Sequence, residues 1–204
     1  MIKEKIKKFW NFLWYSNNIL SWIVLFIIAF LLVKFIFFPL AGLVLHTKMP
    51  FVIVESYSMQ HCNSIKGNVL WHCGFDEYWL NYGGWYVERE ISKEKFKNFS
   101  FKNGLDAGDI VVIKGKKNYE VGDIIVFFAN SKPIIHRIVN KSCETHFENG
   151  GYASCFFETK GDNNPGQLDF EKQIAYEQIA GKAIAKIPKL GWVKLLPFKL
   201  LGLA

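Results

Sequence analysis

The chain has few cysteines, and no pattern that would place them around a metal. Only four occur among 204 residues: Cys62, Cys73, Cys143 and Cys155. A zinc site would need His61 or His72 to converge with cysteines far away in the sequence, and the spacing matches no compact set of two cysteines and two histidines. We therefore expect no metal and no cofactor.

The chain also lacks a recognisable nucleic-acid-binding module, although its formal net charge is +7. Its lysines are scattered over both ends and several loops, so we do not expect nucleic acid to be a partner. The lysines toward the C-terminus are suited to attract anionic lipid head groups. They are Lys182, Lys186, Lys189, Lys194 and Lys199. The simpler alternative is that most of them are ordinary solvated side chains.

A long apolar run near the N-terminus is the clearest feature that the chain does have. Residues 19–40 are apolar except for Ser21 and Lys34. A helix needs roughly 20 residues to cross the hydrocarbon core of a bilayer. No small-residue cleavage pattern follows the run, which argues against a signal peptide that is removed. We predict a single transmembrane helix at 19–40, with the lipid bilayer as a partner.

The flanks of this run predict its orientation. Residues 1–18 form a basic segment, expected to be cytoplasmic or interfacial, because lysines tend to remain inside. The lysines are Lys3, Lys5, Lys7 and Lys8, and the aromatic residues Trp10, Trp14 and Tyr15 follow them. The rest of the chain is then expected on the extracytoplasmic side of the cell membrane. Residues 191–204, too short and broken to span, are expected to be a membrane-interfacial tail.

Beyond Leu45 the sequence changes to short runs of branched and aromatic residues, each bounded by turn-forming residues. Such runs predict strands. They are Phe51–Val54, Ile110–Ile113, Ile124–Phe128 and Ile134–Val139. We predict a mainly β domain at 45–190, built on a curled sheet.

Residues 61–105 interrupt this domain with an aromatic insertion. Its tryptophans, tyrosines and phenylalanines include Trp79, Tyr82 and Phe96. Aromatic rings of this kind favour the membrane interface, so one interpretation is a flap that rests on the bilayer. The other is a small local core. The sequence does not decide between them.

The predicted outer location suits disulfides, and four cysteines allow three pairings. Cys62–Cys73 and Cys143–Cys155 each enclose a short loop, and we favour this arrangement. Each bridge would contribute about 2–3 kcal/mol to the free energy of unfolding.

A serine and a histidine stand out as candidates for catalysis. Ser58 lies in the run Ser56-Tyr57-Ser58-Met59, just beyond the apolar segment, and His136 lies in Ile135-His136-Arg137. A serine hydroxyl is a poor nucleophile until a nearby base takes its proton. Histidine changes its charge near neutral pH and can be that base.

These elements resemble type I signal peptidases, closest to the archaeal and endoplasmic-reticulum branch, in which histidine replaces the lysine of the bacterial branch. The resemblance covers about Pro50 to Lys194. Further elements occur in the family's order: Ala107–Val112, Val121–Phe127, Pro133–Arg137, Thr159–Asn164 and Ile187–Lys194. The resemblance implies a curled β fold and a membrane-bound serine endopeptidase that removes signal peptides after small residues. Its partners would be signal-peptide-bearing precursors.

The resemblance also implies roles for individual residues. Ser58 would be the nucleophile, His136 the general base, and Ser56 would join the Ser58 backbone N–H in an oxyanion hole. Two carboxylates compete for the third position, Asp162 and Asp169. We favour Asp169, since Asp162 lies in a Gly-Asp-Asn-Asn turn where a structural role is expected. The interval before Asp169 is one residue longer than in many relatives.

Two alternative functions remain open at this level. One is a processing protease dedicated to a single surface precursor. The other is a catalytically idle, membrane-anchored binding module that uses the aromatic insertion.

Overall fold

The structure is a computed structural model that describes residues 2–61, 64–66, 69–71, 73–146 and 152–200. The chain divides into two compact units, Met1–Val44 and Leu45–Ala204. Each is described here by itself.

The first unit is helical. Helix α1 spans Ile2–Tyr15, and α2 spans Ile19–Leu32. Asn18 caps α2, because its side chain accepts a hydrogen bond from the Leu20 N–H. One π-helical turn, Val33–Phe37, follows before α3, Phe38–Leu45.

The π turn has an identifiable cause in the sequence. Pro39 has no N–H to donate, and its ring would clash with the carbonyl one turn earlier. The wider turn accommodates this change, and the Phe38 N–H reaches back to the Val33 carbonyl. The apolar helix thereby continues without a break from Ile19 to Leu45, over 27 residues, with none of its most apolar stretch buried. It is long and apolar enough to cross a membrane.

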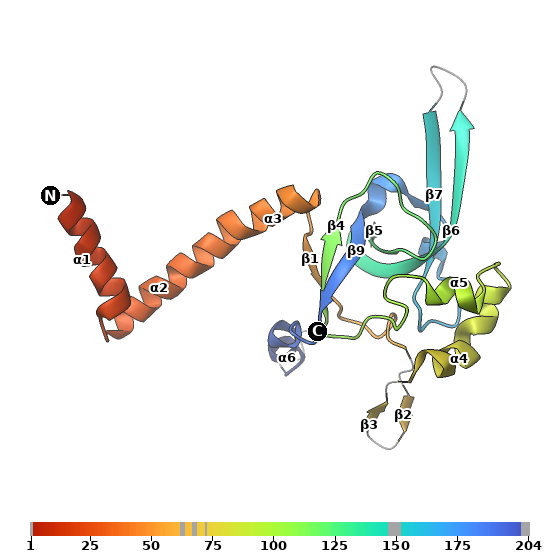
Figure 1. Ribbon diagram of the computed structural model, residues 1–204, viewed down its shortest axis with the longest axis horizontal. Helices are drawn as coiled ribbons and strands as arrows, with labels where there is room; N and C mark the ends of the chain where they lie inside the picture. Colours follow the sequence, from red (N-terminus) through yellow and green to blue (C-terminus); the bar gives the residue numbers. More distant parts are fainter. Residues whose placement is uncertain (1, 62–63, 67–68, 72, 147–151, 201–204) are drawn as a thin grey trace. The chain divides into compact units, whose positions relative to one another are not determined.

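The second unit is built on one antiparallel sheet, so the predicted mainly β class is confirmed (Figure 1). Its seven strands lie in the order β1-β4-β9-β5-β6-β7-β8. Their bounds are β1 Phe51–Ile53, β4 Ile110–Lys114, β5 Ile124–Ala129, β6 Lys132–His146, β7 Tyr152–Lys160, β8 Ile174–Ala175 and β9 Ile179–Ile187. A separate pair, β2 Ser64–Lys66 and β3 Val69–Trp71, belongs to the aromatic insertion. The four runs predicted as strands correspond to β1, β4, β5 and β6.

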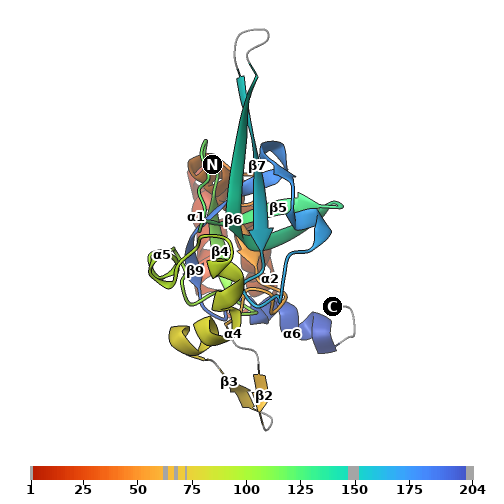
Figure 2. The ribbon, with the colours of Figure 1, turned by 90° about the vertical axis from the view of Figure 1, so that its right-hand side faces the viewer.

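Strand β6 is the longest and curls the sheet. Its first part pairs with β5 up to Arg137, and from Arg137 onward it pairs with β7. Figure 2 shows the β6–β7 pair extending as a long hairpin. Residues 132–136 of β6 therefore have a strand on one side only, and β1 is likewise an edge strand, paired with β4 alone. Among the described strands, these are two free strand edges, each without a neighbouring strand on one side.

Two Gly-Asp turns are built in the same way and precede β4 and β5. Gly108 and Gly122 have φ values of 87° and 98°, which a residue with a side chain adopts only with strain. In each turn the aspartate carboxylate accepts the backbone N–H three residues earlier. Asp109 also pairs with Lys186 and Asp123 with Lys182, both on β9. The turns thus fix where two strands begin.

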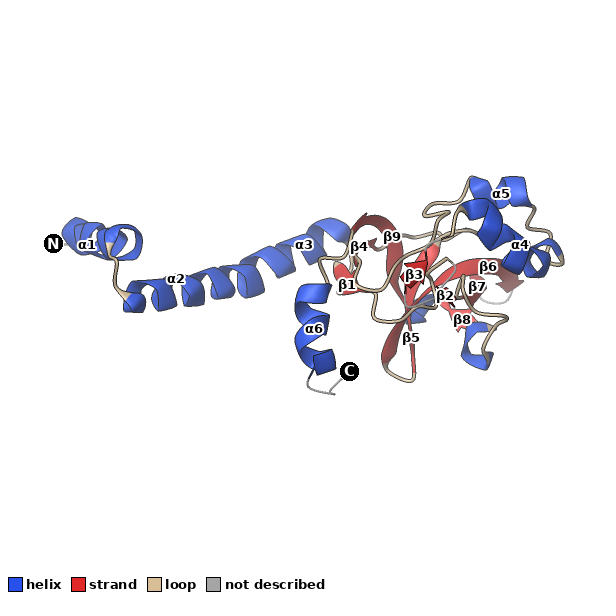
Figure 3. Cartoon of the chain, turned by 90° about the horizontal axis from the view of Figure 1, so that it is seen from below, coloured by secondary structure: helices blue, strands red, loops and turns tan. Residues whose placement is uncertain are grey.

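The aromatic insertion forms a small core of its own. Helix α4 spans Phe75–Val87 and α5 spans Lys93–Lys97 (Figure 3). Tyr78 and Tyr86 on α4 and Phe96 on α5 are fully buried and pack together with Val139 of β6. Of the two interpretations of the insertion, the structure therefore supports the local core.

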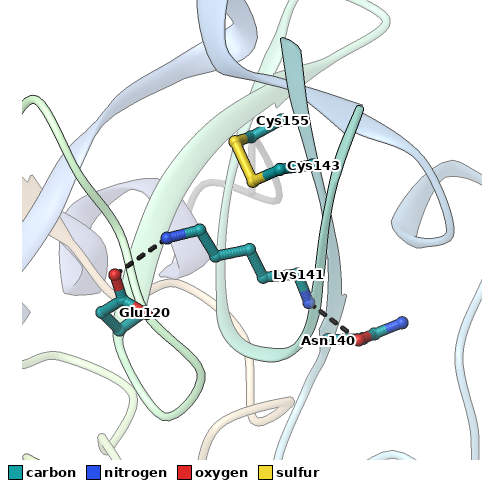
Figure 4. Close-up of a disulfide and its surroundings, with 5 residues drawn as sticks. All are labelled: Glu120, Asn140, Lys141, Cys143 and Cys155. Atoms are coloured by element: carbon teal, nitrogen blue, oxygen red, sulfur yellow. Dashed lines mark hydrogen bonds and ion pairs between the residues drawn. A yellow bond between two sulfur atoms is a disulfide. The ribbon is translucent and has the colours of Figure 1, made fainter. Parts of the chain in front are cut away.

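The β6–β7 hairpin carries a disulfide between Cys143 and Cys155, which face each other across the two strands (Figure 4). This predicted pairing is confirmed. Nearby, the Lys141 ammonium pairs with Glu120, in the loop before β5. The other predicted pair includes Cys62, which lies outside the described residues.

The second unit ends with short helices. The 3-10 turns Asp169–Glu171 and Tyr176–Gln178 flank β8, and helix α6 spans Trp192–Leu200. Leu195 of α6 is buried, whereas Val193, Leu196 and Leu200 are exposed.

Candidate active site

Ser58 lies in a tight turn just after β1. The Gln60 N–H closes the turn on the Tyr57 carbonyl, and the neighbouring Met59 side chain is fully buried in the core. Because Met59 is anchored, the hydroxyl of Ser58 is held at the surface of the unit. Its Oγ lies 2.9 Å from Nε2 of His136.

His136 lies on β6, opposite Ile125 of β5, and its ring is largely buried. Its second nitrogen, Nδ1, lies 2.5 Å from Oε1 of Glu171. Glu171 is fully buried, and its other carboxylate oxygen accepts the Leu168 N–H at 2.7 Å. Ser58, His136 and Glu171 therefore form a continuous chain of hydrogen bonds, from a hydroxyl to an imidazole to a buried carboxylate.

The sequence predicted an aspartate in the place that Glu171 occupies, and the structure corrects this. Asp169 points into solvent, with 99% of its side chain exposed, and pairs with Lys172. Asp169 and Glu171 lie in the same 3-10 turn. Because this helix has about three residues per turn, side chains two positions apart point to different sides. Asp162 is fully buried but bonds to Arg137, His61 and Tyr86. The sequence indicated the correct segment and the wrong residue in it.

Ser58 and His136 line a cleft of about 650 Å³, whereas Glu171 is buried behind His136. One wall is β1, and the facing wall is residues 133–136 of β6, the two free strand edges described above. Leu168 and Phe170, from the turn that supplies Glu171, line it as well. The cleft begins at Met49, four residues after the apolar helix ends.

Donors suited to an oxyanion surround the Ser58 hydroxyl. Ser56 lines the cleft, and its Oγ lies 3.1 Å from the Oγ of Ser58. Within the described part of the chain, the backbone N–H of Ser58 donates to no acceptor. The structure thus brings together Ser58, Ser56 and His136 as the sequence predicted.

Behind the cleft, Arg137 and Asp162 form a buried ion pair. Arg137 donates to both oxygens of Asp162, at 2.9 and 2.7 Å, and its remaining N–H groups reach the carbonyls of Ser100, Phe101 and Gly122. Burial alone would raise the pKa of Asp162. The Arg137 charge and the hydrogen bonds from His61 and Arg137 outweigh burial and hold that pKa well below its usual range.

Helix α4 packs on the turn that contains Asp162. Tyr78, Tyr82 and Tyr86 lie on one face of α4, four residues apart, and donate to the Asp162 carbonyl, the Asn163 side chain and the Asp162 carboxylate. The Lys160 ammonium lies over the rings of Tyr82, Trp85 and Tyr86, and burial lowers its pKa to about 8. The insertion therefore stabilises the backbone behind the candidate catalytic residues Ser58 and His136.

Gly161, in the same turn, lies close to both Ser58 and His136. A Cβ at Gly161 would lie 2.8 Å from Nε2 of His136 and 2.9 Å from the Ser58 carbonyl. The Asn163 N–H also donates to that carbonyl, at 2.8 Å. Only glycine allows the turn this close, so the position of the base depends on the turn that α4 stabilises.

Comparison with known proteins finds a similar sequence. Over 108 residues, 48% of its length, the chain is 29% identical to the signal peptidase complex catalytic subunit SEC11 of Komagataella phaffii. The chain is a distant relative of this signal peptidase subunit. The matched region spans 61% of the relative's length. No protein-family model matches the chain.

The Asp162 carboxylate of this chain is expected to matter for stability rather than for proton transfer. Asp162→Asn leaves Arg137 buried without a counter-charge, which should lower the free energy of unfolding by about 3 kcal/mol or more and the melting temperature by ~6–12 °C. The unfolded carboxyl titrates near pH 4, above its native pKa. The contribution of the Asp162 carboxylate to the free energy of unfolding is therefore complete above about pH 5 and is lost as the pH falls below that value. Thermal unfolding of the wild type and variant from pH 7 to pH 3 measures this.

The matched control is Asp169→Asn, which removes an equal charge from an exposed pair and should shift the melting temperature by less than about 2 °C. Equal melting temperatures for Asp162→Asn and the wild type at pH 7 would show that the buried pair does not stabilise the fold.

Proposed function

We propose that the chain is a membrane-anchored serine endopeptidase that removes signal peptides from exported precursors. The observation that carries this proposal is the Ser58–His136–Glu171 chain of hydrogen bonds at a cleft between two free strand edges. Similarity to a signal peptidase catalytic subunit supports the substrate class.

The geometry fits acyl transfer to a serine. Nε2 of His136 takes the proton of Ser58 as Oγ attacks the substrate carbonyl carbon, and the Ser58 N–H and the Ser56 hydroxyl donate to the resulting oxyanion. The Glu171 carboxylate holds Nδ1–H of His136 and stabilises the imidazolium without taking its proton. The imidazolium then protonates the leaving amine, and a water molecule activated by the same histidine hydrolyses the acyl-enzyme.

The two free edges suit an extended peptide. A substrate strand could add its backbone hydrogen bonds to β1, to residues 132–136 of β6, or to both, with alternate side chains directed into the cleft. Small side chains at the residue before the cut and two residues further back would allow the scissile carbonyl to approach Ser58.

The apolar helix Ile19–Leu45 is the proposed single membrane anchor. The lysines of α1 would remain in the cytoplasm, and the β unit would face the extracytoplasmic side. Helix α6, with Val193, Leu196 and Leu200 exposed around a buried Leu195, is proposed as the interfacial tail.

The decisive experiment mixes the full chain, reconstituted in lipid, with several unrelated signal-bearing precursors and maps each cut by mass spectrometry. Cleavage of all of them after small residues is expected. Cleavage of one precursor alone would favour the dedicated processing protease. No cleavage, together with no labelling of Ser58 by a serine-directed covalent probe, would favour the idle binding module and contradict the proposal.

A further inference from the structure

The C-terminal lysines that the sequence analysis assigned to lipid head groups are mostly engaged with carboxylates. Lys182, Lys186, Lys189 and Lys194 pair with Asp123, Asp109, Asp106 and Glu55 respectively. The side chain of Lys199 lies outside the described residues. These pairs weaken the attraction of those lysines for an anionic surface.

A different set of lysines has no such partner. Lys48, Lys114, Lys116 and Lys117, here called the basic rim, are all exposed, and none forms an ion pair with a described carboxylate. Two carboxylates of the adjoining loop, Glu120 and Asp123, are already paired, with Lys141 and Lys182. The basic rim therefore keeps its positive charge.

The segment that carries most of the basic rim is hydrogen-bonded to Leu45, the last residue of the apolar helix. The segments 45–50 and 113–117 lie side by side, because the Gly115 N–H donates to the Leu45 carbonyl and the Ile113 N–H to that of Pro50. The approach is so close that a Cβ at Gly115 would lie 2.0 Å from the His46 carbonyl oxygen. A cavity of about 370 Å³, lined by His46, Lys116 and Lys117 among others, adjoins the contact.

The length of the apolar helix determines where the contact between Leu45 and Gly115 would lie relative to the bilayer. Its 27 residues extend about 40 Å at ~1.5 Å per residue, whereas the hydrocarbon core is about 30 Å thick and the bilayer with its head groups about 40–45 Å. Leu45, bonded to Gly115, would thus lie at the level of the head groups, and so would the lysines beside it.

We infer that the basic rim docks on anionic phospholipid head groups of the outer bilayer surface, holding the β unit against the membrane. The partner is a lipid surface, recognised by its phosphate charge. The inference requires that Ile19–Leu45 spans the bilayer, but it does not require peptidase activity.

Labelling of lysines in nanodiscs tests this directly. The full chain is incorporated into discs of zwitterionic phosphatidylcholine alone or with 30% phosphatidylglycerol, treated briefly with a water-soluble amine-acylating reagent, and analysed by mass spectrometry. At about 1 kcal/mol per lysine near an anionic surface, labelling of the basic rim should fall about fivefold in the anionic discs. Lys95 and Lys97 on α5, which are exposed and form no ion pair with a described carboxylate, are the internal control and should change less than about twofold.

A matched pair of double variants tests the cause. Lys116→Gln with Lys117→Gln should restore the labelling of Lys48 and Lys114 in anionic discs toward the zwitterionic rate, and Lys95→Gln with Lys97→Gln, an equal charge change, should not. Raising the salt concentration should also remove the protection, because the attraction is screened. Equal labelling in both kinds of disc, or a chain that does not enter the discs, would overturn the inference.

Discussion

Ser58→Ala and His136→Ala should each abolish nearly all precursor cleavage, lowering kcat/KM by at least about 10⁴-fold. The reason is that Ser58 Oγ and His136 Nε2, 2.9 Å apart, are proposed to act as one unit. The serine needs a base to take its proton, and without Ser58 no acyl-enzyme can form. The double variant should be scarcely slower than either single variant. Single-turnover cleavage of a fluorescent precursor measures all three.

Substitutions of two further serines serve as comparisons for Ser58→Ala. Ser56→Ala removes one oxyanion donor and should cost about 10²–10³-fold. Ser142→Ala changes an exposed serine on the distal part of β6 and should leave the rate unaltered. If purified Ser58→Ala retained substantial cleavage, the serine-peptidase mechanism would be wrong.

Glu171→Gln is expected to lower kcat by about 10²–10⁴-fold while KM changes less than about threefold. The amide can still accept the Nδ1–H of His136, but it cannot stabilise the imidazolium that forms as Ser58 attacks. Glu171 touches no reacting atom in the proposed mechanism, so its role is to position and stabilise the base. Steady-state kinetics across the pH range, with the melting temperature measured alongside, test this.

Asp169→Asn is the matched control for Glu171→Gln, since both remove one carboxylate from the same turn. It should retain the wild-type rate, because Asp169 is exposed and pairs only with Lys172. A fast, stable Glu171→Gln beside a crippled Asp169→Asn would reverse the assignment in favour of the aspartate that the sequence suggested.

The sequence predicted four strands of the sheet, β1, β4, β5 and β6, because their cause is local. Branched residues between turn formers define β1, β4, β5 and β6, and the two Gly-Asp pairs mark where β4 and β5 start. The curl of the sheet is also consistent with the motif resemblance. These features depend on neighbours in the chain, which a sequence displays directly.

Glu171 could not be predicted with the same rules. The choice among Asp162, Asp169 and Glu171 depends on which side of a short 3-10 turn faces β6, and this depends on packing from distant segments. A glutamate also reaches one bond further than an aspartate, so a site one or two residues beyond the expected position can still meet His136. The one signal in the sequence is a third carboxylate in the same segment.

Helix α4 was missed for a different reason. Its aromatic residues have strand propensity, and Gly83 and Gly84 in its middle disfavour a helix. The pattern that overrides both is the spacing of Tyr78, Tyr82 and Tyr86, four residues apart, which places three hydroxyls on one face. Tertiary hydrogen bonds to the turn at 161–163 then compensate for the poor local propensity.

If the chain is the anchored peptidase proposed above, the short connection between the apolar helix and the cleft would limit where it can cut. Met49, which lines the cleft, lies four positions after Leu45, and even a fully extended chain over that interval reaches only about 14 Å. An anchored enzyme and a precursor held by its own apolar segment would therefore search for each other in two dimensions, at a raised effective concentration. The short connection would also restrict cleavage by distance. Peptide bonds close to the bilayer would be within reach of the cleft, whereas identical sequences in a folded, released protein would not be cleaved.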